Sequence, residues 1–124
     1  MRRQRHGKII IIGSLAGLIG VPFQSYYAAS KHAVEGCFKS LRLEVRSFGI
    51  QVSVVEGFFQ TNLHHAFEYA EPTIRDYDNI RANALQVLST SIQDAATPEP
   101  IAKTVLKKIH SKDPGFSFRV GKTR

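Results

Sequence analysis

The stretch GKIIIIGSLAGLIGVPFQSYYAASK, residues 7–31, determines how the rest of the chain is organised. It begins with four consecutive isoleucines, Ile9 to Ile12, and a glycine-rich turn that carries Ser14 follows them. A short run that is apolar at every position is typical of a strand buried on both faces of a parallel sheet. The glycines let the backbone turn tightly around Ser14. The stretch therefore predicts a buried strand whose carboxyl end presents a hydroxyl group.

The second half of this stretch begins a long helix, expected over residues 25–48. Ser25 can cap its amino end, and Gly49 is placed to end it in the left-handed conformation. Tyr27 and Lys31 are four residues apart and therefore project from one face of the helix. The buried stripe of the helix is expected to contain the apolar residues that recur at every fourth position: Ala29, Ala33, Cys37, Leu41 and Val45.

Three positions on this helix carry further expectations. Glu35 and Lys39 are spaced to form an ion pair on the solvent side. Cys37 is the only cysteine of the chain and is expected to be a small buried apolar residue. A single cysteine excludes an internal disulfide, which fits a reducing compartment and therefore a cytoplasmic protein.

The rest of the chain continues the alternation of strands and helices. A second strand is expected at residues 50–55, which completes a β-α-β unit with a right-handed crossover. The turn at residues 56–62 then lies at a strand's carboxyl end, where ligands bind in open α/β sheets. Residues 63–92 are expected to be mostly helical. Thr97 can cap a further helix, and residues 116–120, FSFRV, indicate a last short strand.

Two motifs at the expected strand ends form a combined pattern. The segment YAASK runs from Tyr27 to Lys31, with Ser14 thirteen residues before Tyr27, and a Gly-x-x-x-Thr turn joins Gly57 to Thr61. Together they resemble the active-site signature of the short-chain dehydrogenase/reductase family. The resemblance implies an α/β fold, namely the second half of a Rossmann-like doubly wound parallel sheet. It also implies that the whole chain is the C-terminal portion of one NAD(P)-binding domain, without the N-terminal glycine-rich βαβ unit.

The same resemblance implies an oxidoreductase that transfers a hydride between NAD or NADP and a small-molecule carbonyl or alcohol substrate, and the chain is expected to be a fragment of that enzyme, inactive alone. A phenol is a poor base at neutral pH, and a neighbouring cation favours the phenolate. By resemblance, Tyr27 is the general acid/base, Lys31 supports it and holds the nicotinamide ribose, and Ser14 positions the carbonyl. The resemblance assigns the cofactor contacts to Tyr27, Lys31, Gly57, Phe59 and Thr61.

Two positions in the covered region depart from the family's pattern. Gly13 stands where serine is common, and Glu56 stands where proline usually precedes Gly57. A carboxylate at Glu56 is expected to lie near the nicotinamide. No residue of the chain matches the part of the family that selects NAD or NADP, so the cofactor choice stays open.

Residues 62–92 are expected to form lid helices over the substrate. Their apolar and aromatic side chains indicate either a lipophilic substrate or ordinary packing. The complete enzyme is expected to be a homo-oligomer. An alternative function is a non-catalytic interaction fragment that pairs with a full-length relative through helix 25–48, which resembles the helix that such enzymes use to pair subunits.

Composition limits the other classes of function. The chain has 124 residues, at most one domain, and a formal net charge of +7. Its basic residues are not interleaved with aromatic ones, so a solvated surface is preferred to nucleic-acid binding. The apolar run after residue 9 is broken by glycines and is too short to span a bilayer, so no membrane segment is expected. His64, His65 and Glu68 suggest a metal site, but no third ligand follows at a suitable spacing, so no metal is expected.

Overall fold

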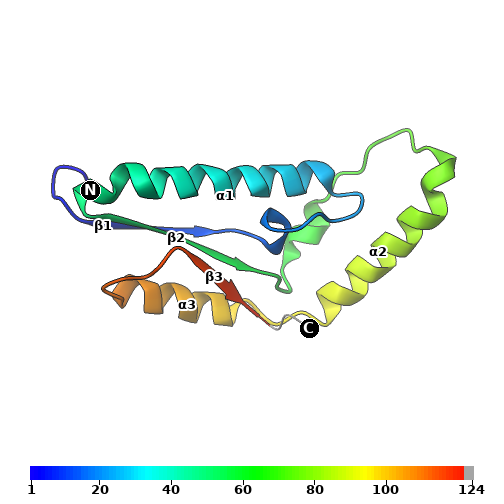
Figure 1. Ribbon diagram of the computed structural model, residues 1–124. Coiled ribbons are helices and arrows are strands. Elements are labelled where there is room, and N and C mark those ends of the chain that lie inside the picture. The colour runs from blue at the N-terminus through cyan, green and yellow to red at the C-terminus, as the bar shows by residue number, and fades with distance from the viewer. Residues whose placement is uncertain (122–124) are drawn as a thin grey trace.

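The computed structural model describes residues 1–121, together with their side chains except that of His64. Its strands are β1 (Gly7–Ile12), β2 (Ile50–Gly57) and β3 (Ser117–Val120). All three run parallel, in the order β1-β2-β3 (Figure 1). The expected strand, helix, strand unit and the expected last strand are both confirmed.

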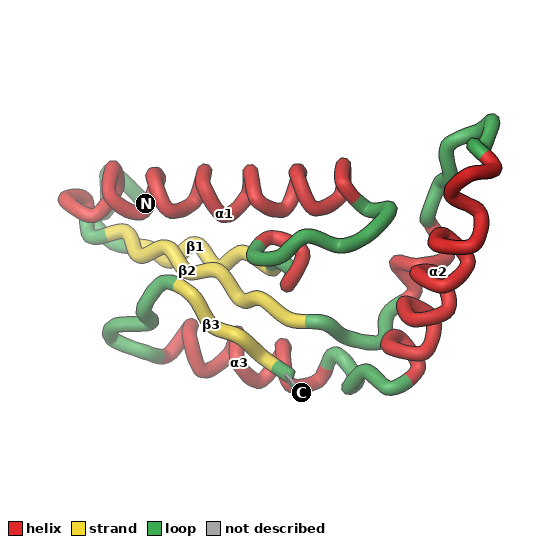
Figure 2. The backbone as a smooth tube through the Cα atoms, turned by 45° about the vertical axis from the view of Figure 1, so that its right-hand side comes forward, coloured by secondary structure: helices red, strands yellow, loops and turns green. Residues whose placement is uncertain are grey.

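Helices cover both faces of this sheet. Helix α1 (Ser25–Val45) lies along one face and α3 (Glu99–His110) lies along the other (Figures 1 and 2). Helix α2 (Asp78–Gln93) stands apart from both, beyond the carboxyl ends of the strands. The short 3-10 helices are η1 (Leu15–Gly17), η2 (Arg46–Phe48), η3 (Asn62–Ala66) and η4 (Arg75–Tyr77). This α/β arrangement confirms the expected partial Rossmann-like fold.

The register of the sheet brings the two expected site turns together. Gly7 pairs with Ile50 and Ile12 with Val55, so β1 and β2 end at the same edge of the sheet. The Gly13 N–H then donates a hydrogen bond of 2.9 Å to the Val55 carbonyl. The turn that carries Ser14 is therefore fastened directly to the end of β2.

The buried strand is β2, not β1. Val54 and Val55 are fully buried in β2, whereas the residues of β1 are half-exposed and Ile12 is 50% exposed. The prediction that the isoleucine strand is buried on both faces is therefore wrong. The reason is position, because β2 lies between two strands and under two helices while β1 is at the edge of the described sheet.

The face of α1 that packs on the sheet also differs from the prediction. Ala28 and Glu35 are its buried residues, whereas the predicted stripe residues Ala29, Ala33 and Cys37 are exposed. Four residues turn an α-helix by about 400°, so a strict four-residue repeat drifts by about 40° at each step and leaves any one face. A mixture of three- and four-residue steps remains on one face, and that mixture contains Glu35.

The helix ends are only partly as expected. Gly49 has φ +70° and caps η2 in the left-handed conformation, as predicted. Ser25 is the first residue of α1, and neither it nor the capping residue Gln24 makes a side-chain cap. Thr97 is not a cap either, because Pro98 occupies that position before α3. Residues 67–74 lie outside any helix, so the segment 63–92 is less helical than predicted.

Candidate active site

The first part of the site is the turn after β1. Ser14 is half-buried, and its hydroxyl oxygen accepts a hydrogen bond of 3.2 Å from the Ala16 N–H. A Cβ atom at Gly17 would lie 2.9 Å from the Lys31 carbonyl oxygen, so η1 packs against the backbone of α1. This close approach requires glycine and holds Ser14 beside the first turns of α1.

The second part is the amino-terminal end of α1. Tyr27 and Lys31 are both half-buried, and the Lys31 ammonium nitrogen lies 5.6 Å from the centroid of the Tyr27 ring. Ser30 turns back to the helix, where its hydroxyl donates a hydrogen bond of 2.7 Å to the Tyr27 carbonyl. The expected juxtaposition of a phenol and an ammonium group is therefore present in the fold.

The third part is the segment after β2. The Phe59 ring is 8% exposed and lies over Gly57, where a Cβ atom would approach the ring to 2.0 Å. Phe59 also forms a parallel bridge with Ala96, which joins this segment to the residues before α3. The Thr61 hydroxyl oxygen accepts a hydrogen bond of 3.3 Å from the Leu63 N–H. Packing of Phe59 is thus sufficient to explain why residue 57 is glycine.

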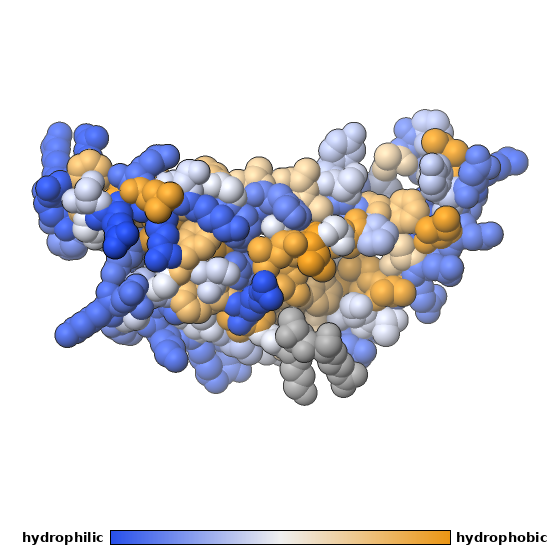
Figure 3. All heavy atoms as spheres, in the orientation of Figure 1, coloured by the Kyte–Doolittle hydropathy of each residue, from blue (hydrophilic) through white to orange (hydrophobic). Residues whose placement is uncertain are grey.

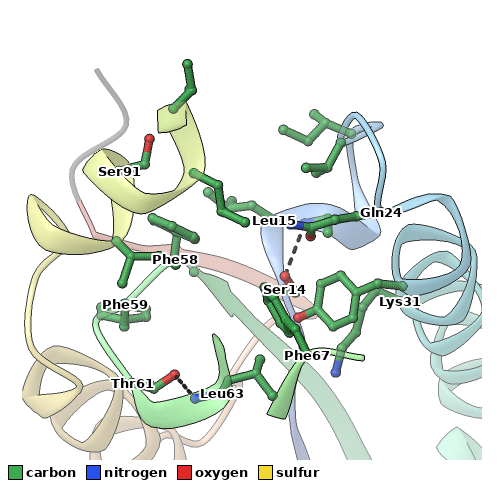
Figure 4. Close-up of a pocket in the computed structure, with 18 of the residues that line it drawn as sticks. Ser14, Leu15, Gln24, Lys31, Phe58, Phe59, Thr61, Leu63, Phe67 and Ser91 are labelled. Carbon is green, nitrogen blue, oxygen red and sulfur yellow. Dashed lines mark hydrogen bonds between the residues drawn. The ribbon is translucent and has the colours of Figure 1, made fainter. Parts of the chain in front are cut away.

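These three parts line one cleft of about 760 Å³, closed on its far side by α2. The predicted site residues that line it are Ser14, Tyr27, Lys31, Gly57, Phe59 and Thr61. Figure 4 shows Ser14 and Lys31 on one side of the cleft and Phe58, Phe59 and Thr61 on the other. The rest of the lining is mostly apolar, and apolar side chains gather around the hollow in the space-filling view (Figure 3).

The sequence did not indicate three polar residues of this lining. Gln24 lies just before α1, while Asn83 and Ser91 project from α2. A signal for them is available only once α2 is known to border the cleft, because the spacing of polar residues along a helix also fits a solvated face.

Glu56 does not lie where the sequence suggested. Its side chain is fully buried and is absent from the cleft, and one of its carboxylate oxygens accepts a hydrogen bond of 2.7 Å from the Ser117 hydroxyl. The expectation that this carboxylate lies near the nicotinamide is therefore wrong, because residues alternate across a strand and Gly57 faces the cleft instead.

Glu35 is also buried, although its ion pair with Lys39 is present at 3.8 Å. The prediction that the pair lies on the solvent side is therefore wrong for Glu35, whereas the Lys39 side chain is 58% exposed. Burial raises the pKa of the Glu35 carboxyl, and the neighbouring Glu56 charge raises it further.

The described residues were also compared with what a metal site and a membrane-spanning helix require. Within the described part of the chain, no three His, Cys, Asp or Glu side chains are grouped closely enough to hold a metal ion. The metal hypothesis involved the His64 side chain, which lies outside the described residues. No helix among residues 1–121 combines the length and apolar character that crossing a membrane requires.

The chain is similar in sequence to proteins of a known family. A family profile described as short chain dehydrogenase matches residues 1–72, and the chain belongs to this family. The 3-ketodihydrosphingosine reductase of Bacteroides thetaiotaomicron is 36% identical over 98% of the chain, which spans 46% of that protein. Dehydrogenase/reductase SDR family member 7B of Xenopus laevis is 34% identical over 88% of the chain, which spans 31% of it.

Solved structures agree with this assignment. A short-chain dehydrogenase from Streptomyces avermitilis superposes with a TM-score of 0.75 and 25% identity, covering 98% of this chain and 44% of that one. A short-chain dehydrogenase/reductase from Burkholderia phymatum, solved in complex with NAD, has the same fold, with a TM-score of 0.74 and 23% identity over 96% of this chain and 44% of that one. The chain therefore spans less than half the length of both solved structures.

Proposed function

We propose that the enzyme to which this chain contributes transfers a hydride between a nicotinamide cofactor and a carbonyl or alcohol carbon. The observation that carries the proposal is the placement of the Lys31 ammonium 5.6 Å from the Tyr27 ring, in the cleft that Ser14 also lines. Relatives of the chain are named as reductases and dehydrogenases, which supports the same reaction class.

The donor set of the cleft suits the nicotinamide half of a dinucleotide. Lys31 and Tyr27 would offer an ammonium and a phenol to the ribose hydroxyls, and Gly57, Phe59 and Thr61 would hold the nicotinamide ring. When bound, the cofactor supplies or accepts the hydride. These residues do not discriminate between NAD and NADP, because the two cofactors differ at the adenosine end.

Side chains of the cleft donate or accept the proton that accompanies the hydride. In the reduction direction, the Tyr27 O–H donates its proton to the carbonyl oxygen, and in oxidation the phenolate takes a proton from the alcohol. The Lys31 charge stabilises that phenolate. Ser14 accepts from the Ala16 N–H, which leaves its own hydroxyl proton free to donate to the substrate oxygen.

The lining of the cleft favours a lipophilic substrate. A second cavity of about 650 Å³ adjoins the first, and both share the side chains of Pro22, Leu63, Phe67 and Leu88. An elongated apolar substrate could place its carbonyl beside Tyr27 and its chain along this shared wall. Helix α2 would then act as the predicted lid, and the protein would work in the cytoplasm as part of a homo-oligomer.

Binding of nicotinamide mononucleotide to the chain tests this proposal, because that probe is the half of the cofactor that the cleft would hold. Saturation-transfer NMR should show contact with the nicotinamide protons in the wild-type chain and its loss in Lys31→Met. Adenosine monophosphate serves as the matched control and should show no contact. Equal signals from both probes, or a signal unchanged by Lys31→Met, would contradict the assignment.

The exposed face of α1 favours a second candidate function, pairing with a full-length relative. Tyr26 is 92% exposed and Leu43 is 74% exposed, and Ala29, Ala33 and Cys37 are exposed between them. Such a face buries its apolar atoms when another helix packs on it. Co-purification with a full-length relative, abolished by Leu43→Asp and unchanged by Tyr27→Phe, would support pairing. Co-purification that survives Leu43→Asp would contradict it.

A further inference from the structure

Two buried glutamates lie behind the turn that carries Ser14. Glu35 on α1 is 3% exposed and Glu56 on β2 is fully buried. One oxygen of Glu56 accepts a hydrogen bond from Ser117. Among the described residues, no hydrogen-bond donor reaches the other Glu56 oxygen or either oxygen of Glu35. Two ionised carboxylates in this position would leave three buried acceptor atoms without partners, which is costly.

The two side chains meet at Gly13. A Cβ atom on that residue would lie 3.4 Å from an oxygen of Glu35 and 3.6 Å from Cγ of Glu56. Both glutamates therefore border the space beside the Cα of Gly13, one residue before Ser14. That backbone is also tied to β2, because the Gly13 N–H donates to the Val55 carbonyl. Any change in the charge or spacing of the two carboxyl groups acts directly on the Ser14 turn.

The charged groups around the two carboxyls cannot neutralise both. On α1, the Lys39 ammonium lies 3.8 Å from Glu35, beyond hydrogen-bond length, and its side chain is 58% exposed. His32, also on α1, is exposed, with its Nδ1 2.9 Å from the Ala28 carbonyl oxygen. On β3 the uncharged Ser117 hydroxyl donates to Glu56, whereas Arg119, which pairs with Glu56 in the register of the sheet, is exposed and forms no ion pair with it among the described residues. A screened ammonium, an exposed guanidinium and an exposed imidazole are weak compensation for two buried negative charges.

We infer that Glu35 and Glu56 share one proton, donated by the Glu35 carboxyl to the Glu56 carboxylate, and that this shared proton holds the Ser14 turn in its active position. Protonation supplies the donor that the unpaired oxygens lack. Glu56 is the acceptor in this arrangement, because the Ser117 hydroxyl already donates to one of its oxygens. Burial and the Glu56 charge both raise the pKa of Glu35, in agreement with this assignment.

The inference has a structural part and a functional part. The shared proton is independent of the proposed function, whereas its effect on turnover rests on that function. When the proton is lost, two negative charges face each other behind Gly13, and the repulsion displaces the Ser14 hydroxyl. Glu35 and Glu56 are therefore positioning residues, which act on the substrate through Ser14.

Infrared spectroscopy of the chain tests the structural part. Wild type should keep the carbonyl band of one protonated carboxyl group at pH values where exposed glutamates have already ionised. Glu35→Gln should abolish that band, while Glu44→Gln, which changes an exposed carboxylate on the same helix, should retain it. A band that disappears together with those of the exposed glutamates, or that survives Glu35→Gln, would overturn the shared proton.

The pH profile of turnover in the complete enzyme tests the functional part. Above the ionisation of the pair, kcat/KM of wild type should fall by about tenfold per pH unit, as for loss of one essential proton. Glu35→Gln should lack that fall, because its amide still donates to Glu56 but does not titrate. Glu44→Gln should keep it. Identical profiles for wild type and Glu35→Gln, with the infrared band present, would overturn the positioning role alone.

Discussion

The ammonium nitrogen of Lys31 lies 5.6 Å from the centroid of the Tyr27 ring, one helical turn further along α1. Both side chains reach the cleft that Ser14 lines from the end of β1. Because α1 packs against η1, a helix and a turn from different parts of the chain place a cation, a phenol and a hydroxyl in one cleft. The proposed chemistry depends on this arrangement.

Replacing Lys31 by methionine should lower turnover by removing the charge that stabilises the Tyr27 phenolate. A unit charge about 4–6 Å from another contributes about 1–3 kcal/mol between the limits of bulk water and a protein surface, which corresponds to a loss of roughly 5- to 150-fold in kcat. Steady-state kinetics of the complete enzyme measure the effect. Lys103→Met is the matched control, because Lys103 pairs with Glu99 on the surface of α3 at 2.8 Å. Equal losses in the two variants would contradict a role for Lys31.

Replacing Gly57 by alanine should destabilise the chain. The new Cβ atom would lie 2.0 Å from the Phe59 ring and 2.7 Å from the Val120 carbonyl oxygen, so β3 or the ring must move. We expect a decrease of about 1–3 kcal/mol in the free energy of unfolding, as for overpacking elsewhere. Denaturant titration measures it.

Gly36→Ala is the control for that experiment. No atom lies within 4 Å of a Cβ at this exposed position of α1, so alanine should stabilise the helix by about 0.5–1 kcal/mol. Opposite signs for the two substitutions are therefore expected. Destabilisation by both would show that the packing around Gly57 is not the cause.

The raised pKa of Glu35 predicts how stability depends on pH. The folded chain binds this proton more tightly than the unfolded chain does. The resulting contribution to the free energy of unfolding is complete below the pKa of an unfolded glutamate, about 4.3. This contribution is lost as the pH rises through the raised pKa of the folded chain, and above that pKa none of it remains. Compared with Glu35→Gln, the free energy of unfolding of wild type should therefore fall across this window. A difference that does not change with pH would refute the prediction.

The exposure of Cys37 predicts its reactivity. In the folded chain the thiol should react with a disulfide reagent as quickly as in the unfolded chain, because its side chain is exposed on α1. The rate of reaction with excess reagent measures this. Protection that disappears when the chain is diluted would indicate that α1 is covered by a second chain. Protection at all dilutions would contradict the exposed position.

The sequence predicted the parts of the site that depend on short spacings. Lys31 lies four residues after Tyr27 on a helix, and Ser14 lies two residues after the end of β1, so their placement needed only the β-α-β order. Glu35 could not be placed this way, because a charged residue four positions from a lysine looks like half of a surface ion pair. Its burial depends on how α1 is rotated over the sheet, which is a property of tertiary packing.

The errors at β1 and at residues 67–74 have a similar origin. Four isoleucines predict a strand, but their burial depends on what lies beside that strand in the sheet. Aromatic and apolar residues such as Phe67, Tyr69 and Ile74 are as compatible with a loop over a cleft as with a helix. The sequence also did not show which of Glu56 and Gly57 faces the site, because this depends on how the alternating residues of β2 are oriented in the sheet.

Hydride transfer by a hybrid enzyme tests whether Tyr27 is the proton donor. The hybrid would join the part of the Bacteroides reductase that this chain does not cover to residues 1–124, with a long-chain apolar ketone as substrate. With cofactor deuterated at the nicotinamide C4, we expect deuterium in the alcohol product and a loss of about 10²- to 10⁴-fold in rate for Tyr27→Phe. Tyr26→Phe, at a 92% exposed position, should retain the rate. A folded hybrid in which Tyr27→Phe transfers deuterium as quickly as wild type would show that Tyr27 is not the proton donor.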